Sequence, residues 1–118
     1  MDERSEQLRE RTKAFALRIL RVFRSLPASA DIQILGKQLV RCGTSVGANY
    51  RSACRARSRA EFIARIGIVV EEADESVFWL ELLIDTHAIK QEKLEDLLIE
   101  ARELTAIFTA SQRTMRQK

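Results

Sequence analysis

The 118-residue sequence is poor in the residues that interrupt regular structure, with four glycines and one proline. Sandwiches and barrels need a turn roughly every ten residues, so this shortage excludes most all-β folds. The sequence also has no run approaching the roughly 20 apolar residues that span a bilayer. We therefore expect a helical protein without a membrane segment.

Cysteine and histidine are also scarce, with two cysteines and one histidine. Cys42 and Cys54 are twelve residues apart in one predicted helix, a rise of about 18 Å that a disulfide cannot bridge. With no secretory signal at the N-terminus, both thiols are expected to be reduced in the cytoplasm. His87 is the single histidine, and no Cys/His cluster has zinc spacing. These absences predict no metal, no cofactor and no enzymatic activity.

What the sequence has in abundance is apolar residues at alternating intervals of three and four. This spacing is typical of the buried seam of a helix in a bundle. Four segments show it: Leu8, Thr12, Phe15, Ile19, Val22 and Leu26; Ile32, Leu35, Leu39, Cys42, Val46, Asn49, Ala53 and Ala56; Phe62, Ile66, Val69, Ala73, Ser76, Leu80 and Leu83; Leu94, Leu97, Ala101, Leu104, Phe108, Ser111 and Met115.

Signals between these segments mark the helix ends. Pro27 ends the first helix, Ser58 and Glu61 have the spacing of a capping box, and residues 85–89 interrupt the pattern. Because short connections force consecutive helices to be antiparallel, the sequence predicts one all-α domain over residues 1–118, an up-down-up-down four-helix bundle.

Glycines within the second helix have two interpretations. Gly43 and Gly47 flank Thr-Ser-Val, but the segment lacks the Gly-Lys-Ser/Thr ending of a phosphate-binding loop and does not follow a strand. We expect Gly36, Gly43 and Gly47 to let another helix approach closely.

The third helix has more apolar residues than one seam requires. A helix that is apolar nearly all round is either central in a large core or covered by a partner. Since a small bundle has no central helix, the excess predicts a homo-oligomer interface, and a broad intramolecular face is the alternative. The candidate interface residues are Ile63, Val70, Val77, Trp79 and Ile84.

Acidic residues of the third helix suggest one enzymatic alternative. Glu72 and Glu75 lie on one helical face, as carboxylates do in helical magnesium-dependent nucleotide hydrolases. Such enzymes need a second carboxylate pair on a neighbouring helix, and no well-placed pair is evident. A different hypothesis joins these two residues with Arg41 and Asn49 in an interior polar network.

Charge is divided unevenly along the chain. Residues 1–60 contain 13 basic and 5 acidic groups, whereas residues 61–118 contain 7 basic and 12 acidic groups. An up-down topology brings the end of the second helix to the same end of the molecule as Arg113, Arg116 and Lys118. This basic end could bind phosphates without reading sequence, and its candidate nucleic-acid-binding residues are Arg51, Arg55, Arg57 and Arg59.

The segments Gln38–Arg51 and Arg55–Ile63 closely resemble a bacterial family of four-helix-bundle proteins. Arg24–Pro27 and Glu71–Leu83 also resemble it, so that the similarity extends over nearly the whole chain. Members are described as ribosomal-protein-like because their genes occur in intervening sequences of large-subunit ribosomal RNA genes.

The resemblance implies a cytosolic four-helix subunit that assembles into a homopentameric ring. A related member, the accessory protein of diversity-generating retroelements, is a pentamer that binds nucleic acid and a reverse transcriptase through basic residues. We therefore expect a non-enzymatic oligomer that binds RNA or DNA. The alternatives are a purely structural oligomer whose partner is a protein, and the carboxylate-metal nucleotide hydrolase.

Overall fold

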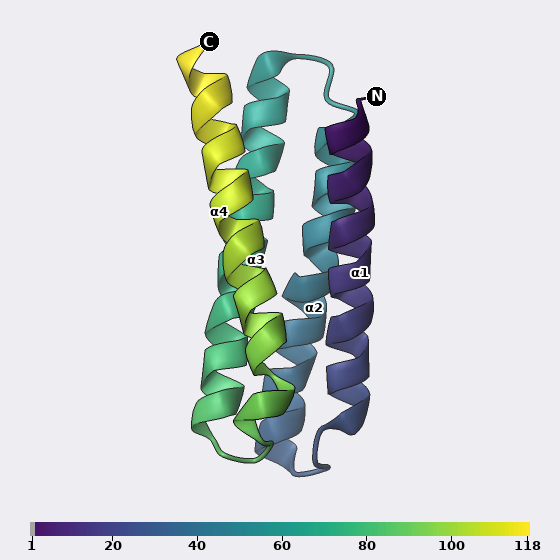
Figure 1. Ribbon diagram of the computed structural model, residues 1–118, viewed down its shortest axis with the longest axis vertical. Helices are drawn as coiled ribbons and strands as arrows, with labels where there is room; N and C mark the ends of the chain where they lie inside the picture. Colours follow the sequence, from purple (N-terminus) through teal and green to yellow (C-terminus); the bar gives the residue numbers. More distant parts are fainter. Residues whose placement is uncertain (1) are drawn as a thin grey trace.

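The computed structural model describes residues 2–118 and contains four long helices (Figure 1). Helix α1 spans Glu3–Ser25, α2 spans Ala30–Ala53, α3 spans Arg59–Asp85 and α4 spans Glu95–Gln117, with a short 3-10 turn, η1, at Gln91–Lys93. Consecutive helices run in opposite directions, and no strand occurs within residues 2–118. The predicted all-α up-down-up-down bundle is confirmed.

The helix ends follow the expected local chemistry. The Asp2 carboxylate accepts the Ser5 amide at 2.8 Å and caps α1, and the Ser58 hydroxyl accepts the Glu61 amide at 3.0 Å and caps α3. After α3, His87 adopts a left-handed backbone conformation with φ 58° in an exposed turn. Such a conformation commonly terminates a helix, so a turn role accounts for the single histidine.

The core consists mainly of predicted seam residues, which are buried along the bundle together with Tyr50 and Leu98. The remaining seam residues are half-buried, among them Ala56, which lies in the α2–α3 turn because α2 ends at Ala53: Leu8, Val22, Leu35, Asn49, Ala56, Phe62, Ser111 and Met115. Phe15 and Ile19 of α1, Leu39 of α2 and Phe108 of α4 are among the most completely buried large side chains. The polar seam residues Thr12 and Ser76 are also fully buried, and each hydroxyl donates to a carbonyl of its own helix, to Leu8 and Glu72 respectively. A satisfied hydroxyl can lie in an apolar seam at little cost.

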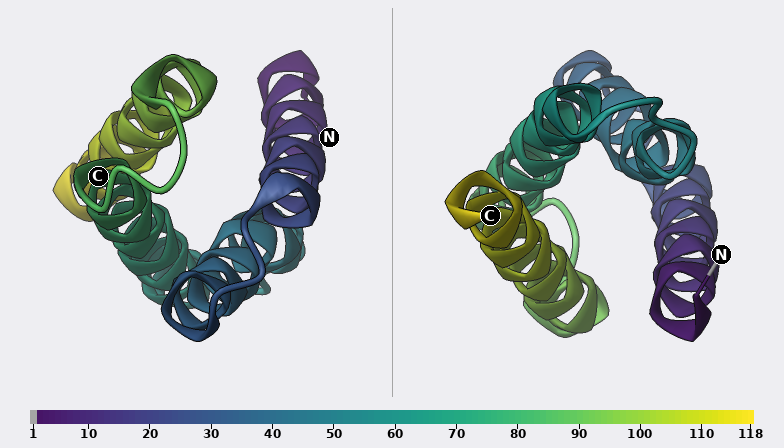
Figure 2. Two further views of the ribbon diagram at one scale, coloured as in Figure 1. Left: turned by 90° about the horizontal axis from the view of Figure 1, so that it is seen from below. Right: turned by 90° about the horizontal axis from the view of Figure 1, so that it is seen from above.

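The four helices do not pack equally. Helix α2 packs closely on α1 and α3, and α3 on α4, whereas α1 and α4 have the loosest contact among neighbouring helices (Figure 2). The close α1–α2 contact is made at Gly36, Gly43 and Gly47, which face side chains of α1 as expected. The bundle measures 47 × 22 × 21 Å.

None of the helices is long and apolar enough to cross a membrane, as judged over residues 2–118.

Candidate nucleic-acid interface

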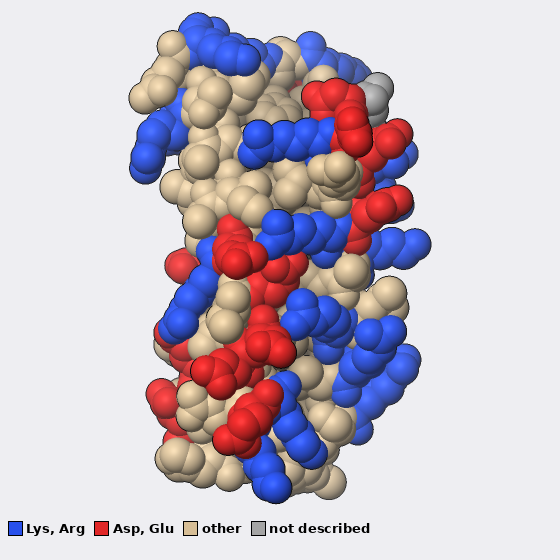
Figure 3. Space-filling view, in the orientation of Figure 1, with Lys and Arg blue, Asp and Glu red and all other residues tan. Residues whose placement is uncertain are grey.

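The antiparallel topology gathers basic residues at the end of the bundle where α2 and α4 finish and α3 begins. Lysine and arginine side chains lie over this end and along the α1 side, whereas acidic side chains form one group over the middle and lower left of the molecule and a second group at upper right, near the start of α1 (Figure 3). The four candidate arginines all lie at this end, but helix α2 ends at Ala53. Arg51, Arg55 and Arg59 recur every four residues in the sequence, but because the helix ends at Ala53 this spacing does not place Arg55 and Arg59 on one helical face with Arg51.

Arg51 lies in a groove between α1 and α2, together with Arg9 and Lys13. The groove contains adjoining pockets of about 390 and 290 Å³, and small residues, Gly47 among them, make part of its lining. The Nε atom of Arg9 is buried and has no hydrogen-bond partner in the described part of the chain. None of the three cations forms an ion pair within residues 2–118.

Two carboxylates reduce the positive charge of this groove. Glu6 and Glu10 line its second pocket beside the same three cations, leaving an excess of one positive charge among these five groups. The groove was not evident from the second helix alone, because two of its cations belong to α1. The spacing of four between Arg9 and Lys13, which places both on one side of α1, is the sequence signal that could have found it.

Arg55 and Arg57 lie in the α2–α3 turn, and both are exposed. The turn itself is held by Glu61, whose carboxylate accepts the Arg57 amide at 2.9 Å and the Arg65 guanidinium at 3.0 Å. These two hydrogen bonds lower the pKa of Glu61. The backbone is thus fixed, while the side chains of Arg55 and Arg57 make no ion pair in the structure described for residues 2–118.

Arg59 has a different position from the other candidates. Its guanidinium donates to the backbone carbonyls of Met115 at 2.8 Å and Arg116 at 3.4 Å, in the last turn of α4. Helix C-termini leave carbonyls without partners and carry partial negative charge, so this arginine satisfies and neutralises the end of α4. Among the four candidates, Arg59 is the one whose side chain forms a hydrogen bond within residues 2–118.

Aromatic stacking is not offered by Tyr50, the tyrosine next to Arg51. Its ring is buried against Phe108, with centroids 5.0 Å apart, and burial raises the pKa of Tyr50 to about 12. Tyr50 therefore has no exposed ring face on which a base could stack.

The candidate oligomer residues of α3 lie on two sides of the helix. Ile63, Val70, Val77 and Ile84 recur every seven residues and share the side of Glu81, which pairs with Arg102 of α4. Trp79 lies instead on the side of Glu72 and Glu75, which pair with Arg41 of α2. Val70, Val77, Trp79 and Ile84 are half-buried and pack against the core of their own chain, and Ile63 is also half-buried. The apolar side chains that α3 exposes most are instead Ile68 and Phe78, at 44% and 53%.

The acidic pair of α3 shares one cation of α2. Glu72 and Glu75 both pair with Arg41, and the Glu72 contact measures 3.5 Å. The predicted interior network with Asn49 is wrong, because Arg41 is half exposed and the Asn49 amide donates to the Ser45 carbonyl of its own helix. Within residues 2–118, no three His, Cys, Asp or Glu side chains converge in a way that could hold a metal ion.

Both cysteines are free thiols. Cys42 is buried beneath Ser76, whose hydroxyl lies 3.3 Å from its Sγ, and burial raises the pKa of the Cys42 thiol. A thiol with a raised pKa is a poor nucleophile at neutral pH, so Cys42 has the properties of a core residue.

Comparison with known proteins gives a consistent family relationship. A family described as "23S rRNA-intervening sequence protein" matches residues 4–110. The chain is also similar to a crystal structure from Bacteroides thetaiotaomicron, a protein of unknown function from the S23 ribosomal protein family. The two share 34% identity and a TM-score of 0.84, over 92% of this chain and 97% of the other. A search of curated proteins finds no match.

Proposed function

The chain belongs to the 23S rRNA-intervening sequence protein family, and from this membership and the basic end we propose a non-enzymatic, homopentameric bundle that binds RNA or DNA in the cytoplasm. In this proposal the protein contacts phosphates and reads no base sequence. The pentameric number rests on the resemblance of the sequence to a family of ring-forming bundles.

The observation that carries the proposal is a set of cations at the α2–α3 end that form no ion pair within residues 2–118. Arg51, with Arg9 and Lys13, lines a groove whose two pockets measure about 390 and 290 Å³, and Arg55 and Arg57 belong to the adjacent turn. Arginine and lysine contribute affinity through phosphate charge, with release of counterions from the nucleic acid. A ring would repeat this cluster on every subunit.

The test is binding of single-stranded RNA and duplex DNA of unrelated sequences, measured by fluorescence anisotropy over a range of salt concentrations. The test variant is Arg51→Ala/Arg55→Ala/Arg57→Ala, which should remove three phosphate contacts per subunit. Because each contact to a single strand contributes about 0.7 to the slope of log K against log salt, the slope should flatten by about 2 per engaged subunit.

A matched control removes three exposed cations from the other end of the bundle. Lys37→Ala/Lys90→Ala/Lys93→Ala changes the net charge equally and should leave most of the salt slope intact. Equal losses in both variants would contradict a defined basic end. No salt-dependent binding by the native protein would favour the purely structural oligomer.

A further inference from the structure

Two segments of opposite charge lie at the same level along the bundle axis. Residues 11–25 of α1 contain five basic and no acidic residues, whereas residues 71–103 contain eleven acidic and three basic residues. The first segment ends at the α1–α2 turn and the second surrounds the α3–α4 turn, and both turns lie at the same end of the antiparallel bundle. The two segments therefore occupy the same half of the molecule.

The basic face of α1 points away from the core. It consists of Leu17, Arg21 and Arg24, whose spacing of four and three keeps them on one side of the helix. All three are exposed, Leu17 by 46%. The two arginines form no ion pair in the described part of the chain. This face therefore combines two free positive charges with one exposed apolar side chain.

The acidic face has the opposite composition. It consists of Asp74, Phe78 and Asp85 on α3 with Glu95 and Ile99 on α4, and all five side chains are exposed. Phe78 and Ile99 are exposed by 53% and 48%. The three carboxylates form no ion pair within residues 2–118.

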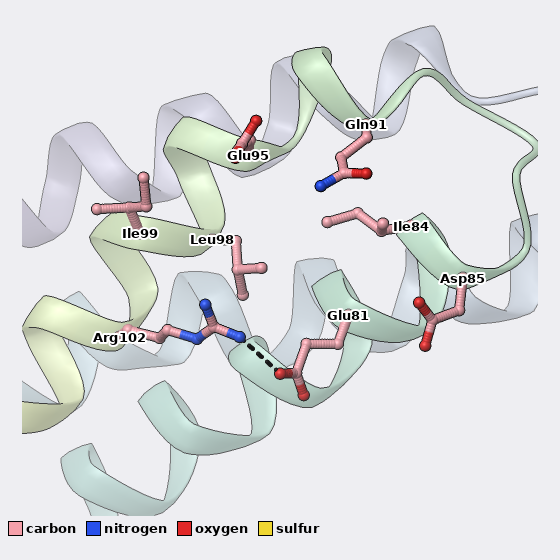
Figure 4. Close-up of a pocket in the computed structure, with 8 residues that line it drawn as sticks. All are labelled: Glu81, Ile84, Asp85, Gln91, Glu95, Leu98, Ile99 and Arg102. Atoms are coloured by element: carbon pink, nitrogen blue, oxygen red, sulfur yellow. Dashed lines mark hydrogen bonds and ion pairs between the residues drawn. The ribbon is translucent and has the colours of Figure 1, made fainter.

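A pocket of about 450 Å³ lies between α3 and α4 on this face (Figure 4). Ile84 and Leu98 extend into it from the two helices, and Asp85 and Glu95 belong to its lining. Glu81 already pairs with Arg102 at 2.8 Å across the pocket. An arginine or lysine from outside could lay its methylene stem on the apolar residues and its charge beside the free carboxylates.

We propose that a second copy of this chain occupies the acidic face, with the basic face of its α1. The inference rests on the self-association in the proposed function and names the surfaces that meet. Arg21 and Arg24 lie at the same end of the bundle as the pocket. Rotation about an axis parallel to the bundle preserves height, so neighbouring copies bring the two faces into register.

The charges favour this head-to-tail contact over its alternatives. A two-fold symmetric contact would place like faces together, and like charges repel. A nucleic acid would be repelled by the acidic face, whereas the basic end at the α2–α3 turn lies in the other half of the molecule. The proposed contact leaves that end open on the same side of every subunit.

The test uses two full-length variants with one face reversed in each. Arg21→Glu/Arg24→Glu makes both faces acidic, and Asp85→Lys/Glu95→Lys makes both basic. Each variant alone should sediment as a monomer at micromolar concentration, because identical charges then meet. An equimolar mixture should associate, and the chain with all four substitutions should assemble like the native protein. Circular dichroism checks that each variant is folded.

Lys37→Glu/Lys93→Glu is the matched control, since it reverses two exposed charges outside both faces, and it should assemble normally. The proposal is overturned if the single-face variants assemble as the native chain does, or if their mixture stays monomeric. A monomeric native protein would overturn self-association as well. Nucleic-acid binding is measured separately, on the monomeric variants. A failure of nucleic-acid binding can therefore be distinguished from a failure of the proposed contact between subunits.

Discussion

Helix α1 packs against α2 on one side and α4 on the other, and these two contacts are built from different chemistry. On the α2 side, glycines bring the backbones close, and a Cβ added at Gly43 would lie 2.8 Å from Ile19 Cγ1. On the α4 side, Arg11 reaches both Glu100 and Glu103 at 2.6 Å. The first contact depends on volume and the second on charge.

The difference shows which part of the bundle is fixed and which can adjust. Close-packed interiors tolerate neither added nor lost volume, so the α1–α2 pair behaves as one unit. The α1–α4 contact is looser, and its basic-end portion has a surface pocket of about 340 Å³ between the two helices, lined in part by Leu8 and Met115. Changes to each contact should therefore have different sizes and different sensitivity to salt.

The largest effect is expected from added volume at the glycine contact. Gly43→Leu should lower the free energy of unfolding by about 1–3 kcal/mol, because Ile19 is fully buried and branched at Cβ and cannot move aside. Urea unfolding followed by circular dichroism measures the loss. The loss should be independent of salt.

Gly67→Ala is the matched control in α3. A Cβ there would meet only the flexible end of Gln112, so the gain in helix propensity, up to about 1 kcal/mol, should appear as unchanged or increased stability. If Gly43→Leu is as well tolerated as this control, α1 and α2 are not closely packed at Gly43.

A smaller effect is expected at the ionic contact. Arg11 is a third exposed and Glu100 is mostly buried, at 34% and 15%, and the pairing raises the pKa of Arg11. A double-mutant cycle of Arg11→Met and Glu100→Gln should give a coupling free energy of about 0.5–1 kcal/mol. The coupling should decrease at high salt, since partly exposed pairs are screened.

The pair Arg102 and Glu81 offers a comparison for this cycle. It joins α3 and α4, and both side chains are about half exposed, so its coupling should be smaller. A salt-independent coupling at Arg11, or one no larger than that of Arg102, would show that packing and not charge joins α1 to α4.

The core of this bundle could be predicted from sequence because burial follows a period. The seam positions recur every three or four residues, and even the polar members Thr12 and Ser76 are buried as the spacing required. The close approach at Gly43 was predictable for the same reason, since the glycines share that side of the helix. Helical periodicity predicts which side of the helix a residue lies on, and the side that faces the core is the side that is buried.

The candidate site was less predictable because it depends on where helices stop and which helices meet. Arg51 and Arg59 are separated by the end of α2 at Ala53, so their spacing no longer defines a face. Arg59 is engaged by carbonyls of α4, 56 positions away in the chain, and Arg51 gains Arg9 and Lys13 from α1. Such partners come from tertiary packing, which a one-dimensional pattern does not contain.

The smallest effect is expected at the free end of α1, which is held by its own cap. The Asp2 carboxylate accepts the Ser5 amide, and this hydrogen bond lowers the pKa of Asp2 below the ordinary value of about 3.9. Because the folded-state pKa is lowered, the stabilisation is present above the unfolded value and is lost as the pH falls through the folded value. The amide chemical shift of Ser5 should follow this titration.

Asp2→Asn separates the cap from its charge. Asparagine caps helices as well as aspartate does but does not titrate, so the Ser5 amide shift should become independent of pH in this range, with the first turn of α1 intact. Asp2→Ala should instead fray that turn at every pH. If acid frays the first turn equally in the native chain and the asparagine variant, this end of α1 depends on the titration of groups in its neighbours and not on its own cap.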